Sequence, residues 1–281
     1  NVVSAGYVGA RYSNLAVAIG NIDLAPVGPG AIQQRRTYYA QLPNVTSIGV
    51  FRSGFEQDYN ALQLVFQRRH RSGLTLGSNY TLAHNTQTSP SPWDVNVIER
   101  FDAGNDVRHR YVLTANYELP FGQSLTGASR QLLAGWQVNA IASFQTGLPY
   151  DITNSTSRTN TGGTDRPNLV GDATLDNPTV GQWFNTAAFA AQTANTLGTN
   201  TVPRNYLHGP NQKRLDLSFF KDVAFTSTAK MQLRFEIYNL TNTPIFANPN
   251  GALGNAAFGT ISSTQAGTTP RQMQFAVKLL F

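Results

Sequence analysis

Apolar and polar residues alternate with a period of two along much of this chain, and the 3.6-residue period of a helix is nearly absent. Residues 231–238 (MQLRFEIY) place an apolar side chain at every second position. The C-terminal segment repeats this alternation, with apolar side chains at Met273, Phe275, Val277, Leu279 and Phe281. Because successive side chains of a strand point to opposite faces, the pattern predicts strands with one apolar and one polar face.

The alternation predicts eight strands bounded by segments rich in turn-forming residues. Several are about twice as long as an average globular strand and have the length of a tilted membrane strand. Their approximate ranges are 5–19, 59–70, 74–85, 108–119, 132–148, 212–224, 230–240 and 270–281.

The predicted connections alternate strictly between short ones, at about 71–73, 120–131 and 225–229, and long ones, at about 20–58, 86–107, 149–211 and 241–269. The long segments show no helical pattern. Transmembrane barrels have tight periplasmic turns and long outer loops. We therefore predict an all-β, antiparallel transmembrane β-barrel in the bacterial outer membrane, with the short turns in the periplasm. An antiparallel sandwich with one wet face gives the same alternation and is the alternative architecture.

Charged residues inside the predicted strands favour the barrel. Arg234 and Glu236 alternate with apolar neighbours at mid-strand, where a charge facing lipid would cost about 2–4 kcal/mol. We expect both, together with Asp216, to face the barrel lumen. The apolar faces are then expected to contact outer-membrane lipid, and the sheet must close because every backbone polar group in a bilayer needs a partner.

Composition narrows the classes further. No apolar run reaches the roughly 20 residues that a membrane-spanning helix needs. The absence of cysteine excludes disulfides and thiolate metal sites. The net charge of +6, from 21 basic and 15 acidic residues, is non-specific by itself. The chain begins at Asn1 without an initiator Met, which we interpret as processing or as a piece of a longer chain.

We find no convincing catalytic, metal or cofactor site and predict that the chain is not an enzyme. The 4 histidines are scattered without metal-ligand spacing. Ser218 and Lys221 match the S-x-x-K string of penicillin-recognising enzymes, but Ser218 lies within a predicted strand and lacks the accompanying motifs. We assign the basic cluster at 68–71 (RRHR) to a turn facing solvent or anionic lipid and expect no nucleic-acid partner.

A series of sequence blocks carries a family resemblance that spans almost the whole chain. The blocks are 59–64 (YNALQL), 68–76 (RRHRSGLTL), 80–82 (YTL), 106–111 (DVRHRY), 117–122 (YELPFG), 133–138 (LAGWQV), 144–150 (FQTGLPY), 204–210 (RNYLHGP), 214–221 (RLDLSFFK), 234–242 (RFEIYNLTN) and 270–275 (PRQMQF). In this order they resemble the C-terminal barrel of TonB-dependent receptors. The resemblance is nearest to the Oar-like group, whose members carry an N-terminal carboxypeptidase-regulatory-like domain.

The resemblance implies a barrel of about 22 strands around a periplasmic plug, with TonB pulling on the plug to import a scarce ligand. The sequence contains no plug, TonB box or regulatory-like domain. We therefore interpret residues 1–281 as the C-terminal third of such a barrel, whose plug and TonB contacts belong to a missing N-terminal part. Siderophore, glycan, peptide and protein ligands all stay open, as do the oligomeric state and the direction of transport.

The resemblance also suggests contact residues. Aromatic side chains of the outer loops are candidates for ligand contact: Trp93, Phe101, Trp183, Phe184 and Phe189. The alternating apolar residues at the end of the chain resemble the signal read by the barrel-assembly machinery, because an exposed edge strand can pair with another sheet edge: Phe275, Val277, Leu279 and Phe281.

A second hypothesis is a small closed barrel, or one part of a split barrel, with a structural, anchoring or adhesive role. Eight strands suffice to close a barrel whose interior is filled by side chains. In a split barrel a partner chain would supply the remaining strands. An outer-membrane enzyme is the third class, but it needs an acidic or Ser–His cluster at one rim, which we cannot assemble from this sequence.

Overall fold

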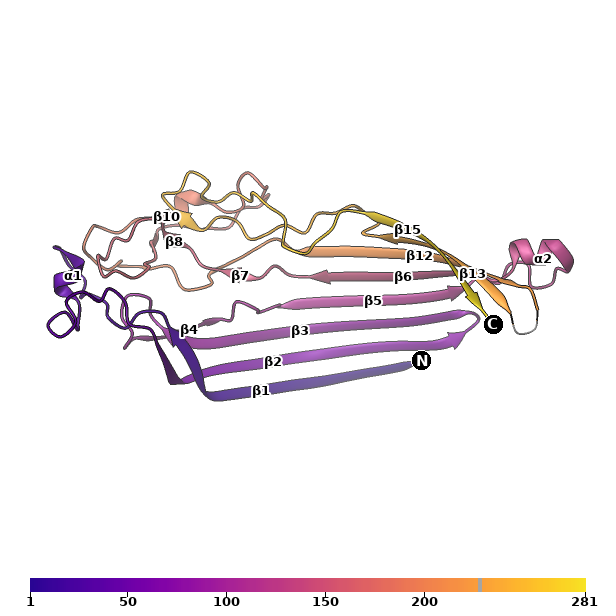
Figure 1. The fold of residues 1–281 in the computed structure, drawn as a ribbon, viewed down its shortest axis with the longest axis horizontal. Coiled ribbons are helices and arrows are strands. Elements are labelled where there is room, and N and C mark those ends of the chain that lie inside the picture. Colours follow the sequence, from indigo (N-terminus) through magenta and orange to yellow (C-terminus); the bar gives the residue numbers. More distant parts are fainter. Residues whose placement is uncertain (227–228) are drawn as a thin grey trace.

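The computed structural model describes residues 1–226 and 229–281, apart from the side chains of His70 and Arg71. Long strands form one antiparallel sheet in which each pairs with its neighbours along the chain (Figure 1). Each overlaps one of the eight predicted strands. They are β1 (Val2–Ile19), β2 (Val50–Arg71), β3 (Leu74–Pro90), β5 (His109–Glu118), β6 (Trp136–Gln145), β12 (Gln212–Ala224), β13 (Lys230–Tyr238) and β15 (Gln272–Leu280).

Shorter elements lie in the connections. β4 (Ile98–Asp102) pairs with the end of β3 and widens the sheet there. Two-residue strands form small pairs in the long loops: β7 (Pro149–Tyr150), β8 (Thr153–Asn154), β9 (Asn168–Leu169), β10 (Phe189–Ala190), β11 (Leu207–His208) and β14 (Ala252–Leu253). The helices are α1 (Ile32–Arg35), α2 (Gly127–Leu133) and one 3₁₀ turn at Thr186–Ala188. No helix among the described residues is both long and apolar enough to cross a membrane.

The long connections gather at one end of the sheet, and the short ones lie at the other end with both termini (Figure 1). We call these the loop end and the turn end. The loop predicted at 20–58 covers only residues 20–49, because β2 begins at Val50 and not at the predicted residue 59. The predicted loop 86–107 contains β4. In the predicted turn 225–229, Ser227 and Thr228 lie outside the described residues.

The connection between β5 and β6 differs from the prediction. It contains α2, so the strand predicted from residue 132 begins only at Trp136. The expectation that this segment is a plain turn was therefore wrong. Gly135 has a φ of 74°, a left-handed conformation that glycine adopts without strain, and it lies between the end of α2 and the start of β6.

The sheet is open. β1 has 18 residues and forms one edge, and β15 has 9 residues and forms the other. Within the described part of the chain, neither edge has a strand on its outer side. The structure therefore holds an antiparallel sheet of barrel type, with two edges whose backbone groups are available for pairing.

One face of the sheet is apolar. Directly paired residues point to the same face, and Phe219, Phe235 and Phe275 are such partners on β12, β13 and β15. Their rings stack with centroids 6.4 and 4.5 Å apart. The register adds further members from these and the other strands: Tyr7, Leu62, Leu64, Tyr80, Leu82, Leu113, Val138, Leu217, Ile237 and Val277. Because Phe275 is 79% exposed, this surface has the character of one that contacts lipid.

The opposite face is polar and carries the charged residues predicted to face the lumen. Asp216 accepts hydrogen bonds from Arg214 Nε at 3.0 Å and from the Asn239 backbone N–H at 2.7 Å. Arg234 Nε donates to Gln232 Oε1 at 2.7 Å. Glu236, the next residue on the same face of β13, lies beside Arg234 in the register. When the apolar face contacts lipid, these side chains point to the inside of a closed barrel.

Candidate ligand site

The long loops contain an apolar core of their own. Phe184 and Phe189 are 2% and 5% exposed, and their rings lie edge to face with centroids 5.5 Å apart. Phe258, from the last loop, packs on Phe184 at 5.1 Å. Tyr150 joins this cluster, where burial raises the pKa of its hydroxyl. Two of the aromatic residues predicted to contact ligand therefore pack in a core that joins separate loops.

A buried carboxylate organises the next layer. Asp165 is 1% exposed and accepts hydrogen bonds from the backbone N–H groups of Arg158 and Thr159 at 2.5 and 2.7 Å. Ser157 Oγ and Asn154 Nδ2 donate to the same carboxylate at 3.0 and 2.6 Å. A buried charge is tolerated only with such complete pairing. Asp165 therefore holds the segment 154–165 in one conformation.

Two arginines fasten this segment to the loop between β3 and β5. Arg166 lies 2.5 Å from Glu99 and places its guanidinium 4.7 Å from the Trp93 ring centroid. Burial lowers the pKa of Arg166, and the charge of Glu99 opposes that shift. Arg204 lies 4.0 Å from the ring centroid of Phe101, which is 7% exposed. Trp93 and Phe101 thus serve as platforms for cations.

A cavity of about 580 Å³ lies between these loops, within the size range of small-molecule sites. Its lining comes from residues 18–24, 89–95 and 154–165, with Arg204. Ser91 Oγ and Asn154 Oδ1 belong to lining residues that are 2% and 8% exposed, and both atoms lack a hydrogen-bond partner among the described residues. Buried polar atoms of this kind are normally satisfied, but both are closed off from the cavity by neighbouring atoms, so the polar groups that can face a ligand are those of other lining residues such as Asn21, Ser155 and Arg204.

A second cavity of about 760 Å³ adjoins the first, because Leu24 and Val95 line both. Its wall includes Trp93, Tyr38 and Phe51. Trp183 and Phe184 line a third cavity of about 370 Å³ beside the apolar core. Of the predicted ligand residues, the structure thus places Trp93, Trp183 and Phe184 at cavities, and Phe189 lines a further cavity of about 400 Å³. Phe101 packs against Arg204 instead. The sequence offers no signal for Ser91 or Asn154, since neutral residues in loops have no periodicity.

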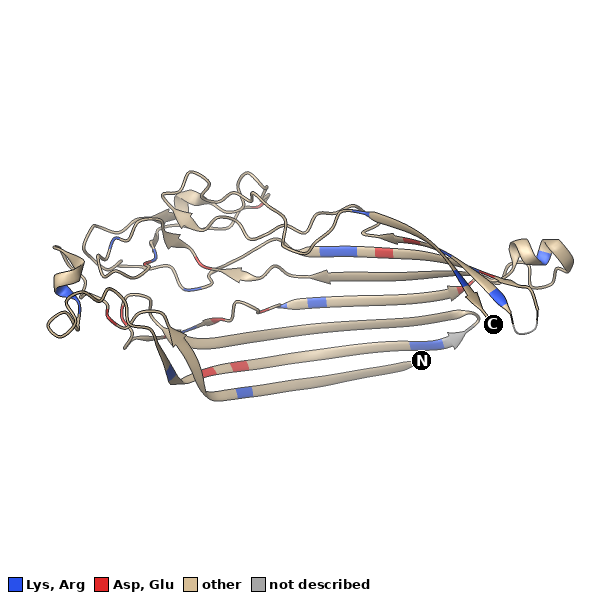
Figure 2. Cartoon of the chain, viewed as in Figure 1, with Lys and Arg blue, Asp and Glu red and all other residues tan. Residues whose placement is uncertain are grey.

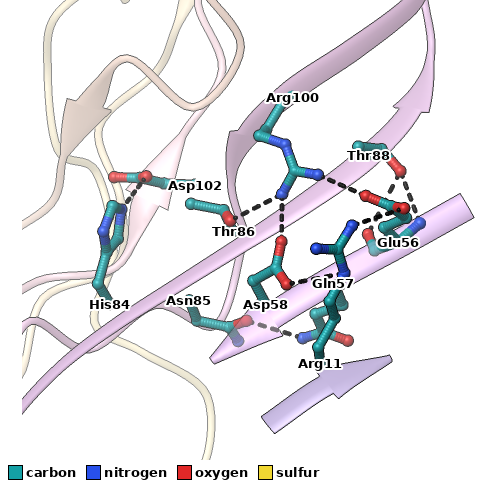
Figure 3. A network of polar contacts seen from close by, with 10 residues as sticks. All are labelled: Arg11, Glu56, Gln57, Asp58, His84, Asn85, Thr86, Thr88, Arg100 and Asp102. Carbon is teal, nitrogen blue, oxygen red and sulfur yellow. Dashed lines mark hydrogen bonds and ion pairs between the residues drawn. The ribbon is translucent and has the colours of Figure 1, made fainter. Parts of the chain in front are cut away.

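A charged network lies above the apolar face at the loop end (Figure 3). Arg100 binds Glu56 at 2.7 Å and Asp58 at 2.5 Å, and Arg11 binds Glu56 at 3.0 Å. These residues come from β1, β2 and β4 and share the face that carries the apolar band. Two arginines and two carboxylates balance in charge, and their ion pairs link β1, β2 and β4. The network lies where these strands extend past the apolar band toward the loops.

A group of possible metal ligands lies nearby. Ligand atoms of Asp102, Asp106 and His208 are within 4.8 Å of one another. Arg108 Nη2 lies 3.4 Å from a carboxylate oxygen of each aspartate, and His84 Nε2 lies 2.8 Å from Asp102. Both carboxylates therefore already have cationic or hydrogen-bonding partners, and we interpret the group as an ion-pair cluster between two loops.

The chain is similar to a known protein family. The family model described as "Outer membrane beta barrel domain" matches residues 1–274. Comparison with curated proteins and with solved structures finds no match.

Proposed function

This chain belongs to the outer membrane beta barrel domain family and lies in the bacterial outer membrane, and from this premise we propose that it supplies the C-terminal strands of a TonB-dependent receptor. In this proposal the turn end is periplasmic, and the loops bind a ligand outside the cell. The polar face lines the lumen and meets a plug that TonB pulls on. The chain has no catalytic role.

The open sheet is the observation that carries the proposal. In hydrocarbon every backbone N–H and C=O needs a partner, and both β1 and β15 have an unpaired outer edge within the described residues. Further strands on these edges satisfy that requirement. A barrel of about 22 strands has a lumen wide enough for a plug, which agrees with the family resemblance of the sequence blocks.

The loop assembly supports the receptor role. Ligand sites are concave, largely pre-formed and equipped with a few convergent polar groups. The 580 Å³ cavity fits this description, because Asp165 and Arg166 fix its wall and its lining includes polar residues such as Asn21, Ser155 and Arg204. Its lining is mostly neutral, so we propose that it takes a polar ligand without a large net charge.

A split barrel, completed by a partner chain and serving as an anchor or adhesin, is the second candidate. The same two open edges favour it over a small closed barrel. Closure of eight strands alone would require the 18-residue β1 to pair with the 9-residue β15, and the structure holds them apart at opposite edges of the sheet.

The intact mass and peptide map of the native polypeptide, extracted from outer membranes, test the proposal. We expect these residues at the end of a much larger chain that contains a plug and that forms formaldehyde cross-links to TonB in cells. A polypeptide limited to these residues overturns the proposal. Copurification of a second barrel chain would then indicate a split barrel, and a heat-modifiable monomer on gels would indicate a small closed one.

A further inference from the structure

The connection that contains α2 extends beyond the sheet at the turn end (Figure 1). It runs from residue 119 to residue 135, between β5 and β6. Its sequence, LPFGQSLTGASRQLLAG, contains one basic residue, Arg130, and no acidic residue. We refer to these residues as the α2 turn.

Two side chains of the apolar face hold the end of the α2 turn. Trp136 Nε1 donates to the Leu132 carbonyl oxygen at 3.1 Å, and Lys221 Nζ donates to the carbonyl oxygen of Ala134. Trp136 and Lys221 are direct cross-strand partners on β6 and β12, in register with Leu233. Because both donors point from the apolar face, the last residues of the turn lie on the side of the sheet that contacts lipid.

The turn exposes large apolar side chains on the described structure. Phe121 is 62% exposed, Leu132 is 70% exposed and Leu133 is 48% exposed. Removal of such side chains from water is favourable, so three of them in a connection of this length favour contact with an apolar medium.

The position of Lys221 marks where the hydrocarbon ends. On β12, Lys213 and Lys221 lie on the apolar face on either side of Leu215, Leu217 and Phe219. Eight residues of strand span about 26 Å, comparable with the apolar band of about 25 Å on transmembrane barrels. Lysine stems also reach toward the interface and keep the charge out of the hydrocarbon. The α2 turn therefore begins at the headgroup level.

The charge at this end is complementary to a membrane surface with anionic lipid. Basic residues outnumber acidic ones at the strand ends and turns (Figure 2). Lys221 is buried and Lys230 forms an ion pair with Asp222 at 3.0 Å, which leaves Arg68, Arg69, Arg130 and Lys278 against Glu118. At the loop end, by contrast, acidic partners balance Arg11 and Arg100. An aromatic side chain at the same level, Trp136, is typical of a membrane interface.

We propose that the α2 turn is an interfacial foot that docks on the phospholipid leaflet at the turn end. Phe121, Leu132 and Leu133 lie at the boundary between headgroups and acyl chains, as in interfacial amphipathic helices, and Arg130 lies at the lipid phosphates. The inference needs the sheet to span the outer membrane. It does not depend on the ligand, on the plug or on TonB.

Site-specific fluorescence in vesicles tests the foot, and the absence of cysteine from these residues leaves no background label. The full native protein, with any cysteine outside these residues replaced by serine, carries Leu132→Cys, labelled with bimane and reconstituted with phosphatidylethanolamine and phosphatidylglycerol. Ser124→Cys, exposed in the same turn, is the matched control. We expect blue-shifted emission at position 132, quenching by doxyl-labelled lipid, and several-fold weaker quenching by iodide than at position 124.

Equal iodide quenching at both positions overturns the proposal. Protection from iodide without quenching by doxyl lipid also overturns it, because that result assigns the turn to a protein partner. Heat-modifiable gel mobility reports folding, and Leu133→Cys replaces the first variant if that one fails to fold. Arg130→Gln is expected to remove the dependence of the signal on phosphatidylglycerol. If TonB cross-links fail to form while doxyl-labelled lipid still quenches position 132, the proposed receptor function is rejected. The interfacial position of the α2 turn is then unaffected.

Discussion

The sheet and the loop assembly use the same kinds of side chain in opposite ways. Phe275 on β15 is 79% exposed, and Phe184 in the loops is 2% exposed. The sheet therefore carries its apolar residues on the outside, where the membrane replaces water, and the loops bury theirs as a water-soluble protein does. One chain thus contains two regions built for two solvents, joined where the Arg11–Arg100 network crosses the strands.

The difference shows that, in the sheet, the exposed fraction of a side chain does not indicate how much that side chain contributes to the stability of the folded protein. An exposed phenylalanine on the apolar face is a membrane contact, and an exposed phenylalanine in the loops is a contact with water. Substitutions in the two regions are therefore expected to respond to different forces. Four predictions examine this contrast.

The largest effect is expected from a cavity in the loop core. Phe184→Ala removes a ring that packs against Phe189, Phe258 and Tyr150, which typically costs about 3–5 kcal/mol. Hydrogen exchange of the loops should rise while the strands stay protected. Val170→Ala, at a loop residue that is 60% exposed, is the control and should change little. Loss of strand protection in the Phe184 variant would show that the two regions are not independent.

A charge on the apolar face is expected to have the next effect. Phe235→Arg places a guanidinium toward lipid, at about 2–4 kcal/mol near the bilayer midplane. Ser218→Arg on the polar face is the matched control, because residue 218 pairs directly with Glu236. Urea titration of folding into vesicles measures both. Equal destabilisation by the two arginines would contradict the assignment of the faces.

Removal of the buried loop carboxylate should have a smaller and local effect. In Asp165→Asn an amide group replaces one oxygen, so its NH2 faces either the N–H groups of Arg158 and Thr159 or the Nδ2 group of Asn154, and donor meets donor in both orientations. We expect a loss of about 1–3 kcal/mol, seen as faster exchange in residues 154–165. Asp176→Asn, at an exposed position in the same loop, should leave hydrogen exchange unchanged. A similar response of both variants would contradict the organising role assigned to Asp165.

The smallest effect is expected at Tyr150, and with the opposite sign. Its hydroxyl is buried without a partner among the described residues. Tyr150→Phe removes this unpaired group and should stabilise the loop core by up to about 1 kcal/mol. Because burial raises the pKa of Tyr150, its phenolate should also be missing from an ultraviolet titration near the usual tyrosine pKa of about 10. Destabilisation by Tyr150→Phe would reveal a partner for the hydroxyl.

The sheet was predictable from the sequence because a two-residue period of apolar and polar residues indicates both where a strand lies and which face each side chain occupies. The alternation across 231–238 predicted β13, and the same alternation placed Arg234 and Glu236 on the polar face. The α2 turn was not predictable, because its helix has 7 residues, too few to show a helical period. The loops have no period at all, so nothing in the sequence separated buried Phe101 from cavity-lining Trp93.

The order of pairing in the sheet has a consequence for how the chain folds. Within the described residues the eight long strands pair in the order in which they follow along the chain, so the sheet can grow one strand at a time. Loop closure costs most for β6 and β12, which are joined by the long connection from Thr146 to Asn211. The loop assembly instead joins distant segments, as when Arg35 donates to the carbonyl oxygen of Asn160 at 2.8 Å, across 125 positions. Its contacts are therefore expected to form last, after strand pairing has brought the loops to one end.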